Sequence, residues 1–161
     1  VQIAKSMGAH VTGVCRRDKV DFVRALGADE VIDYGAVDYT RSGARYDWII
    51  DTDSHHPIVG IRRALTPNGV YVTLGGTTWP ILTAMALGPI LSRATGKWMG
   101  LLLWWKPFHA SDVETVTGLI ARGAVTPQVD RTYPLDEVVE ALAWVAEGRA
   151  RGKVLVTVAD A

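Results

Sequence analysis

A cluster of basic side chains follows the first apolar run of the sequence. The run ends at Cys15, and Arg16, Arg17 and Lys19 come within the next four residues. Two guanidinium groups and one ammonium group at this spacing could pair with a phosphate dianion through charge-assisted hydrogen bonds, and arginine can use two N–H groups at once. The alternative interpretation is the solvated start of a helix, and these residues alone leave both open.

Other side chains that could bind a metal or act in catalysis have no suitable partner residue nearby in the sequence. His55 and His56 are adjacent, so their side chains point in different directions, and no third metal ligand pairs with them by spacing. Asp51 and Asp53 could resemble paired catalytic carboxylates, but a polar loop after a strand is the better interpretation. Cys15 has no identifiable base, which favours a packed thiol over a nucleophile. Because the chain has a single cysteine and no set of four ligands, and the two histidines alone cannot complete a tetrahedral site, we predict no metal site.

Composition narrows the class of protein and its partners. The 161 residues are 48% hydrophobic and 21% charged, which is typical of a globular domain. Basic and acidic residues number 17 each and leave no net charge, so we expect neither nucleic acid nor a membrane as a partner. One cysteine permits no internal disulfide, which favours a reducing compartment, and we expect a cytoplasmic protein. The most apolar stretch, residues 79–91, is shorter than the roughly 20 residues that span a membrane, so we expect a buried helix or a lid.

Helical and strand patterns alternate along the chain. Helices are predicted at residues 1–7, 20–26, 57–65, 111–123 and 135–145, and strands at residues 10–15, 30–33, 46–51, 70–74, 98–105 and 154–158. Ser111 and Glu114 have the spacing of a capping box at the start of one helix. The strand at 46–51 is apolar through its centre, which is typical of a parallel sheet covered on both faces. This order predicts an α/β fold with a doubly wound parallel sheet.

In a doubly wound sheet, ligands lie outside the carboxyl ends of the strands. The strand after the phosphate-binding helix of a dinucleotide fold ends beside the adenosine ribose, where an acid suits NAD and a basic residue suits the 2′-phosphate of NADP. Arg16 and Arg17 stand at that strand end here. If the fold is right, the glycine-rich turn and the first strand precede Val1, because no Gly-x-Gly occurs and neither Gly96 nor Gly152 completes a P-loop.

A set of short segments in a fixed order resembles the C-terminal, cofactor-binding half of a medium-chain dehydrogenase/reductase. The resemblance is to the zinc-independent NADPH:quinone oxidoreductase branch of this alcohol dehydrogenase-like family. The segments are VQIAK and GAHV (1–5 and 8–11), LGADEVIDY (26–34), YDWIID (46–51), LTPNGVYV (65–72), Gly75-Gly76, DRTYPL (130–135) and GRARGKV (148–154). Each segment is weak, but the ordered set covers nearly the whole chain and is specific.

The resemblance implies an NADPH-dependent oxidoreductase that reduces quinone, enone or related carbonyl substrates by hydride transfer without a metal. Carried over by position, Arg16, Arg17 and Tyr34 would surround the adenosine 2′-phosphate. Gly75-Gly76 would let the backbone approach the nicotinamide side, and no catalytic residue is assigned. The loop at residues 52–56 departs from the family, because it is polar where the family's loop is small, apolar and contains glycine.

The resemblance also divides the chain. Residues 1–131 correspond to a partial NAD(P)-binding Rossmann domain that lacks its first strand and glycine-rich turn. Residues 132–161 correspond to a segment that in the family packs back onto a GroES-like catalytic domain, which is absent here. We therefore expect a fragment that is inactive in isolation. Unpaired strand edges, and apolar faces near Trp104, Trp105 and residues 135–145, would make it self-associate as a homo-oligomer, rearrange or be poorly stable.

Two other interpretations stay open. A class I S-adenosylmethionine-dependent methyltransferase also alternates strands and helices, and YDWIID at 46–51 followed by LTPNG at 65–69 resembles its later strands. The basic strand end at Arg16 and Arg17 argues against it, because an acid that binds the ribose is expected there. A non-catalytic Rossmann-like interaction module would keep the fold and use its surface for a partner chain.

Overall fold

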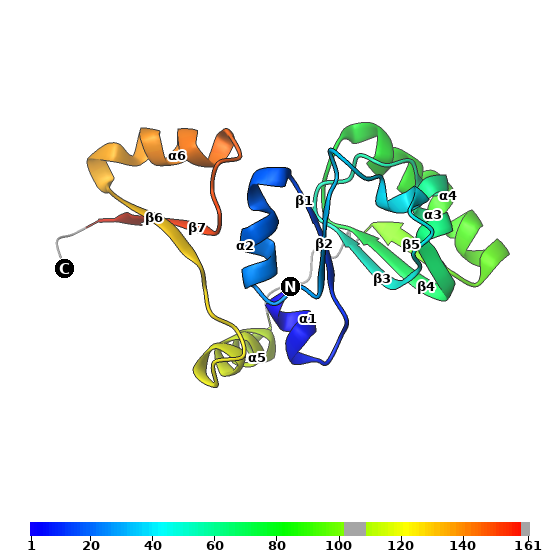
Figure 1. Cartoon of the computed structure of the whole chain (residues 1–161), viewed down its shortest axis with the longest axis horizontal. Coiled ribbons are helices and arrows are strands. Elements are labelled where there is room, and N and C mark those ends of the chain that lie inside the picture. The colour runs from blue at the N-terminus through cyan, green and yellow to red at the C-terminus, as the bar shows by residue number, and fades with distance from the viewer. Residues whose placement is uncertain (102–108, 159–161) are drawn as a thin grey trace. The chain divides into compact units, whose positions relative to one another are not determined.

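The computed structural model describes residues 1–101 and 109–158, and its helices and strands alternate as predicted (Figure 1). The α-helices are α1 (Gln2–Ser6), α2 (Val20–Ala25), α3 (Ile58–Ala64), α4 (Thr78–Thr95), α5 (Ala110–Ala121) and α6 (Val138–Ala146). The strands are β1 (Thr12–Cys15), β2 (Glu30–Asp33), β3 (Tyr46–Asp51), β4 (Leu65–Thr73), β5 (Trp98–Leu101), β6 (Val129–Pro134) and β7 (Lys153–Thr157). Short 3-10 helices lie at Arg17–Lys19, Tyr39–Arg41 and Leu135–Glu137.

The strand pairs of the described residues are all parallel. β1 pairs with β2, β4 pairs with β3 on one side and β5 on the other, and β6 pairs with β7. A parallel pair needs a crossover connection, and α2, α3, α4 and α6 each lie between two paired strands in the chain. The predicted α/β class with parallel strands is therefore confirmed.

Contacts between residues group the chain into two compact units. The first unit comprises Val1–Asp33 and Phe108–Ala161, and the second comprises Tyr34–Pro107. The first unit contains the β1-β2 and β6-β7 pairs, and the second contains the β3-β4-β5 sheet. The division into residues 1–131 and 132–161, which comes from the family resemblance, stays a prediction.

The core of the second unit forms around α3, because its apolar residues recur at helical spacing. Ile58, Ile61 and Leu65 fall within the helix predicted at residues 57–65, and all are at least 97% buried. Their cluster also contains Tyr71, Ala84 and Met99, from β4, α4 and β5. A buried isoleucine of this kind stabilises a domain by about 2–5 kcal/mol relative to alanine.

Strand β6 was not predicted, because its sequence is polar. Asp130 accepts a hydrogen bond of 2.8 Å from Nε1 of Trp144 in α6. The guanidinium carbon of Arg131 lies 3.6 Å from the centroid of the same indole ring, which is a cation–π contact. Asp130 and Arg131 of β6 thus contact Trp144 of α6. β6 therefore lacks the alternation of apolar and polar residues by which most strands are recognised in a sequence.

The segment at residues 79–91 was predicted as a buried helix or a lid, and helix α4 shows that it is a helix that is buried on one side only. Ala84 is 2% exposed, but Trp79 is 75% exposed and Ile90 is 63% exposed. The segment is apolar on all sides, so packing one side of the helix leaves the other apolar side uncovered. None of the helices in the described ranges is long and apolar enough to cross a membrane.

Two local predictions at element boundaries were wrong, and one is only partly visible. α5 begins at Ala110, so Ser111 lies inside the helix, where its carbonyl accepts a hydrogen bond from Thr115 and no side chain caps the N-terminus. β4 begins at Leu65 rather than residue 70, because Tyr46 already pairs with Leu65 before the register shifts at the turn. The strand predicted at 98–105 is present up to Leu101, and its remainder, with Trp104 and Trp105, lies outside the described residues.

Candidate functional site

The carboxyl end of β1 presents the predicted basic cluster. Arg16 is still extended, at φ −72° and ψ 149°, and the 3-10 turn that starts at Arg17 then reverses the chain into α2. The Arg16 guanidinium donates from Nε to Oδ1 of Asp18 at 2.5 Å and from Nη2 to Oδ2 at 2.9 Å. These hydrogen bonds lower the pKa of Asp18 to about 2, so its carboxylate is ionised at neutral pH. The Arg16 guanidinium therefore already forms an ion pair with Asp18, two residues along the chain.

Arg17 differs from the basic residues beside it. Its side chain is exposed, and within residues 1–101 and 109–158 it makes no hydrogen bond or ion pair. Lys19 instead donates from Nζ to the carbonyl oxygen of Ala150 at 2.9 Å. Of the three basic side chains at the β1 exit, Arg17 is the one whose donors are all open to a ligand.

The loop between α6 and β7 lies beside the β1 exit in the first unit. Besides Lys19, Arg16 reaches this loop, with Nη2 at 3.4 Å from the carbonyl oxygen of Gly148. The loop carries Arg149, whose guanidinium pairs with Glu147 at 2.7 Å. Sequence reasoning did not connect the two segments, although the basic run GRARGK at 148–153 was visible in the sequence.

The end of β2 lies level with the end of β1, because Cys15 and Asp33 are partners in the parallel register. Tyr34 follows directly and its side chain is 56% exposed. Burial is the main cause that raises the pKa of the Cys15 thiol, with Asp33 and Asp18 adding to it. A raised pKa keeps the thiol protonated, which supports a packed thiol and argues against a nucleophile.

In the second unit, the exits of β3 and β4 run side by side. Leu74 donates its N–H to the carbonyl of Asp51 at 2.8 Å, and Ser54 donates to the carbonyl of Gly75 at 3.0 Å. Thr77 then donates to the carbonyl of Ser54 at 3.1 Å. These bonds continue the pairing of the two strands past the ends of the sheet.

Gly76 is required by this close approach of the two loops. Its φ is +128°, and a Cβ added there would lie 2.3 Å from the backbone nitrogen of Ser54. Glycine is the residue that tolerates this conformation at low cost. Gly75 and Gly76 were predicted to admit a cofactor, and the structure gives Gly76 a second, internal reason to be glycine.

The polar loop after β3 is satisfied internally. Ser54 and Tyr71 are each 1% exposed, and their hydroxyl groups lie 3.1 Å apart. The Tyr71 hydroxyl also donates to Oδ2 of Asp51 at 3.3 Å, and its burial raises the pKa of the phenol. Asp51 and Ser54 therefore hold the loop in place through Tyr71, which supports the interpretation of this segment as a structural polar loop.

The two adjacent histidines do not converge on a common point. Nε2 of His55 lies 3.2 Å from Asp53, whereas Nδ1 of His56 lies 3.8 Å from Asp38. Across the described ranges, no group of three or more His, Cys, Asp and Glu side chains is placed to hold a metal ion. The donor set of these residues therefore does not fit a zinc ion, which needs at least three protein ligands.

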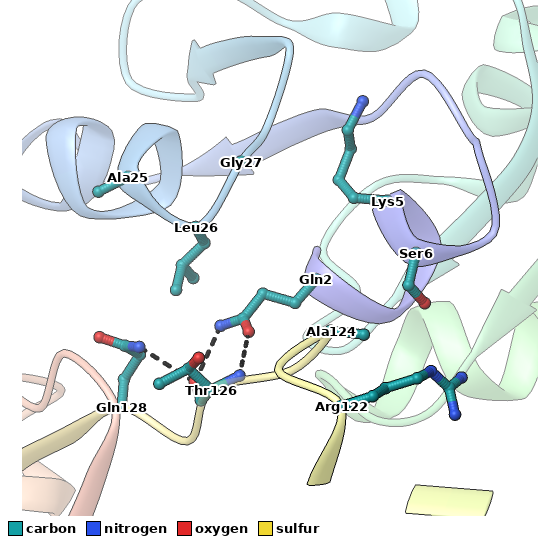
Figure 2. Close-up of a pocket in the computed structure, with 10 residues that line it drawn as sticks. All are labelled: Gln2, Lys5, Ser6, Ala25, Leu26, Gly27, Arg122, Ala124, Thr126 and Gln128. Carbon is teal, nitrogen blue, oxygen red and sulfur yellow. Dashed lines mark hydrogen bonds between the residues drawn. The ribbon is translucent and has the colours of Figure 1, made fainter. Parts of the chain in front are cut away.

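A pocket of about 470 Å³ lies elsewhere in the first unit, between α1 and the segment after α5 (Figure 2). Gln2 joins the two sides, because its amide accepts from the Thr126 nitrogen at 2.6 Å and donates to the Thr126 oxygen at 3.1 Å. Figure 2 shows the charged ends of Lys5 and Arg122 pointing away from Thr126. Lys5 is also paired with Asp29 at 2.8 Å. The described lining contains none of the predicted cofactor residues.

The structure thus brings the predicted residues together in part. Arg16 and Arg17 are neighbours in the first unit, whereas Gly75 and Gly76 lie together in the second unit, which also contains Tyr34. Sequence reasoning missed Asp18, whose carboxylate accepts hydrogen bonds from Arg16. It also missed the loop at 147–152, whose carbonyl groups accept from Arg16 and Lys19.

Comparisons with known proteins match nearly the whole chain. The sequence profile of a family described as zinc-binding dehydrogenase matches residues 26–156. The chain is 34% identical to a mitochondrial NAD(P)H oxidoreductase, RTN4IP1, of Mus musculus, over 98% of this chain and 44% of the relative. It is 31% identical to a chloroplast envelope quinone oxidoreductase homolog of Arabidopsis thaliana, over 97% of this chain and 47% of the relative.

Solved structures give the same result for the fold. A quinone oxidoreductase from Coxiella burnetii superimposes with a TM-score of 0.78 at 25% identity, covering 99% of this chain and 48% of that one. The likeness supports the Rossmann-like, doubly wound arrangement predicted from the sequence. The chain spans less than half the length of each of these relatives.

Proposed function

The chain belongs to the zinc-binding dehydrogenase family of medium-chain dehydrogenases/reductases, and from that membership we propose that it is the cofactor-binding portion of an NADPH-dependent oxidoreductase. The substrates would be quinones, enones or related carbonyl compounds. The relatives named as NAD(P)H and quinone oxidoreductases favour this function over the methyltransferase alternative. An interaction module without cofactor remains the function to exclude by experiment.

The observation that carries the proposal is the basic exit of β1. In a dinucleotide-binding sheet, this strand end lies beside the adenosine ribose, and a basic residue there suits the 2′-phosphate of NADP. Arg17 offers an exposed guanidinium with no partner among the described residues. A phosphate dianion is the ligand that such a fork of N–H donors binds best.

The chain's own residues would hold the cofactor at two places. Arg17, with Arg16 and Tyr34, would bind the adenosine 2′-phosphate, and Gly75-Gly76 would leave room for the nicotinamide side. The bound cofactor would supply the hydride. The hydrogen bonds of Ser54 would keep the loop beside Gly75-Gly76 in a fixed position and so limit the space open to the nicotinamide ring.

The test is cofactor binding by the purified chain, measured as a thermal shift. NADPH should stabilise the chain more than NADH, with a gain of about 2.7 kcal/mol when the ligand is at a hundredfold excess over its dissociation constant. Changing both Arg16 and Arg17 to serine should remove most of the difference between the two cofactors. Arg24→Ser is the matched control, because Arg24 is an exposed arginine of α2 that pairs with Asp21.

Three outcomes would contradict the proposal. If neither cofactor stabilises the chain, the proposal of cofactor binding is refuted and the interaction-module alternative is supported. If NADPH is preferred equally by the wild type and the double variant, the β1 exit is not the phosphate site. Stabilisation by S-adenosylmethionine in place of either nicotinamide cofactor would instead support the methyltransferase alternative.

The location of the protein stays a prediction. The single cysteine is half-buried and unpaired in a disulfide, which is compatible with the reducing cytoplasm we expected. Relatives named as mitochondrial and chloroplast proteins show that the family also works in organelles. Fractionation of the source cells, with detection of this chain, would distinguish these compartments.

A further inference from the structure

The most informative contact at the β1 exit is the fork between Arg16 and Asp18. Nε and Nη2 of Arg16 each meet one carboxylate oxygen, at 2.5 and 2.9 Å. This two-pronged geometry is the one that a guanidinium uses for a phosphate group, so Asp18 occupies the donors that a 2′-phosphate would need. Nη2 also lies 3.4 Å from the carbonyl oxygen of Gly148, which further restrains the guanidinium.

Asp18 also changes the charge at the strand end. Its carboxylate stays ionised because the hydrogen bonds from Arg16 lower its pKa to about 2. Arg16 and Asp18 together therefore contribute no net charge, and an approaching phosphate dianion meets a carboxylate as well as the guanidinium groups of Arg16 and Arg17. The amine of Lys19 donates instead to the carbonyl of Ala150.

We propose that Asp18 is a specificity-determining residue, which weakens the preference for a 2′-phosphate by holding Arg16 and leaving Arg17 as the principal phosphate ligand. In this arrangement Asp18 reduces the preference for NADPH over NADH without removing it. The inference rests on the proposed function, because it concerns the same adenosine subsite.

The proposal makes the effects of two residues depend on each other. Asp18→Asn removes the opposing charge and frees Arg16, so a 2′-phosphate gains a second guanidinium. Arg17→Ser should then cost much in the wild-type background, where Arg17 acts alone, and less in the Asp18→Asn background, where Arg16 can replace it. Two residues that act independently would show the same cost in both backgrounds.

The experiment compares two small probes that differ in one phosphate, adenosine 2′,5′-bisphosphate and adenosine 5′-monophosphate. Their dissociation constants are measured by calorimetry on the purified 161-residue chain and on the variants Asp18→Asn, Arg17→Ser and the double variant. The readout is the ratio of the two constants, because a change in folding or in the common adenosine site moves both constants together. Asp21→Asn is the matched control, since Asp21 is an exposed acid nearby that pairs with Arg24.

Asp18→Asn is expected to raise the ratio in favour of the bisphosphate about tenfold, which is the value of one charge-assisted hydrogen bond at an exposed site. Asp21→Asn should change it less than twofold. In the double variant, the loss caused by Arg17→Ser should be several-fold smaller than in the wild type. Asp18→Ser should raise the ratio by a similar amount. This second variant shows whether the effect comes from the loss of the carboxylate or from the asparagine side chain.

The outcomes separate the inference from the proposed function. A ratio unchanged by Asp18→Asn, or an equal cost of Arg17→Ser in both backgrounds, overturns the role of Asp18 and leaves the cofactor assignment intact. A wild-type chain that binds neither probe, or binds both equally and remains so in every variant, overturns the proposed function and the inference with it. A rise of equal size for Asp18→Asn and Asp21→Asn also overturns the inference, because a general loss of negative charge would explain it.

Discussion

Replacing Gly76 by alanine would test how strongly the second unit depends on the close approach of its two strand-exit loops. A Cβ at this position would lie 2.3 Å from the nitrogen and 2.4 Å from the carbonyl oxygen of Ser54. These atoms are backbone and cannot rotate away, so the loops must separate. We expect the hydrogen bonds from Ser54 to Gly75 and from Thr77 to Ser54 to be lost.

The cost of Gly76→Ala can be divided into two parts. A residue other than glycine at positive φ loses about 1–2 kcal/mol through contact between its Cβ and the backbone. Two backbone hydrogen bonds at roughly 0.5–1.5 kcal/mol each add about 1–3 kcal/mol. The free energy of unfolding should therefore fall by about 2–5 kcal/mol, which is a large fraction of the stability of a typical domain.

Urea unfolding followed by tryptophan fluorescence measures this loss, and Gly43→Ala supplies the control. Gly43 lies in the same unit, has φ +86°, and has no atom within 4 Å of an added Cβ. Its replacement by alanine carries the backbone strain alone and should cost about 1–2 kcal/mol. If Gly76→Ala costs no more than Gly43→Ala, the steric argument is wrong and the two loops are free to move apart.

Asp29 gives the first unit an acid-sensitive contribution to its stability. Hydrogen bonds from Lys5 and from the Val11 nitrogen lower the pKa of Asp29 from 3.8 to about 2, so this contribution is complete above pH 4 and is lost as the pH falls towards 2. Asp29→Asn should remove that part of the pH dependence of the urea midpoint, and an unchanged slope would contradict it. Elemental analysis of chelator-washed protein should find far less than one zinc ion per chain, whereas a stoichiometric amount would refute the prediction of no metal site. The purified chain spans less than half of the quinone oxidoreductase homolog that it matches, so it should show no NADPH-dependent quinone reduction and should be self-associated, rearranged or poorly stable. Rapid turnover by a stable monomer would contradict this prediction.

The fold was predictable where burial leaves a periodic pattern. Ile58, Ile61 and Leu65 recur at helical spacing, and the structure buries all three. β6 escaped prediction because Asp130 and Arg131 interact with Trp144, a contact between segments that sequence periodicity does not record. Ser111 and Glu114 matched a capping box, but the helix starts one residue earlier, and helix ends are the least constrained part of an element.

The sequence predicted which residue types stand at the candidate site, but it did not predict their hydrogen-bond partners. Arg16 and Arg17 stand at the strand end as expected, but the partner of Arg16 depends on the 3-10 turn that brings Asp18 back towards it. The contact with Gly148 depends on tertiary structure, since 132 positions separate the two residues. The loop after β3 was recognised as polar, but its residue types do not show that Ser54 is buried against Tyr71.

The first unit is assembled from two segments that lie far apart in the sequence, so its completion depends on the later segment to be synthesised. Residues 1–33 are synthesised before the second unit, but the partners of α1 and of the β1 exit, Thr126, Gly148 and Ala150, are synthesised after it. The second unit, Tyr34–Pro107, is one continuous stretch and can fold as soon as it is released. A nascent chain that has emerged from the ribosome as far as residue 108 would carry a folded second unit and a segment 1–33 still open to chaperones and proteases.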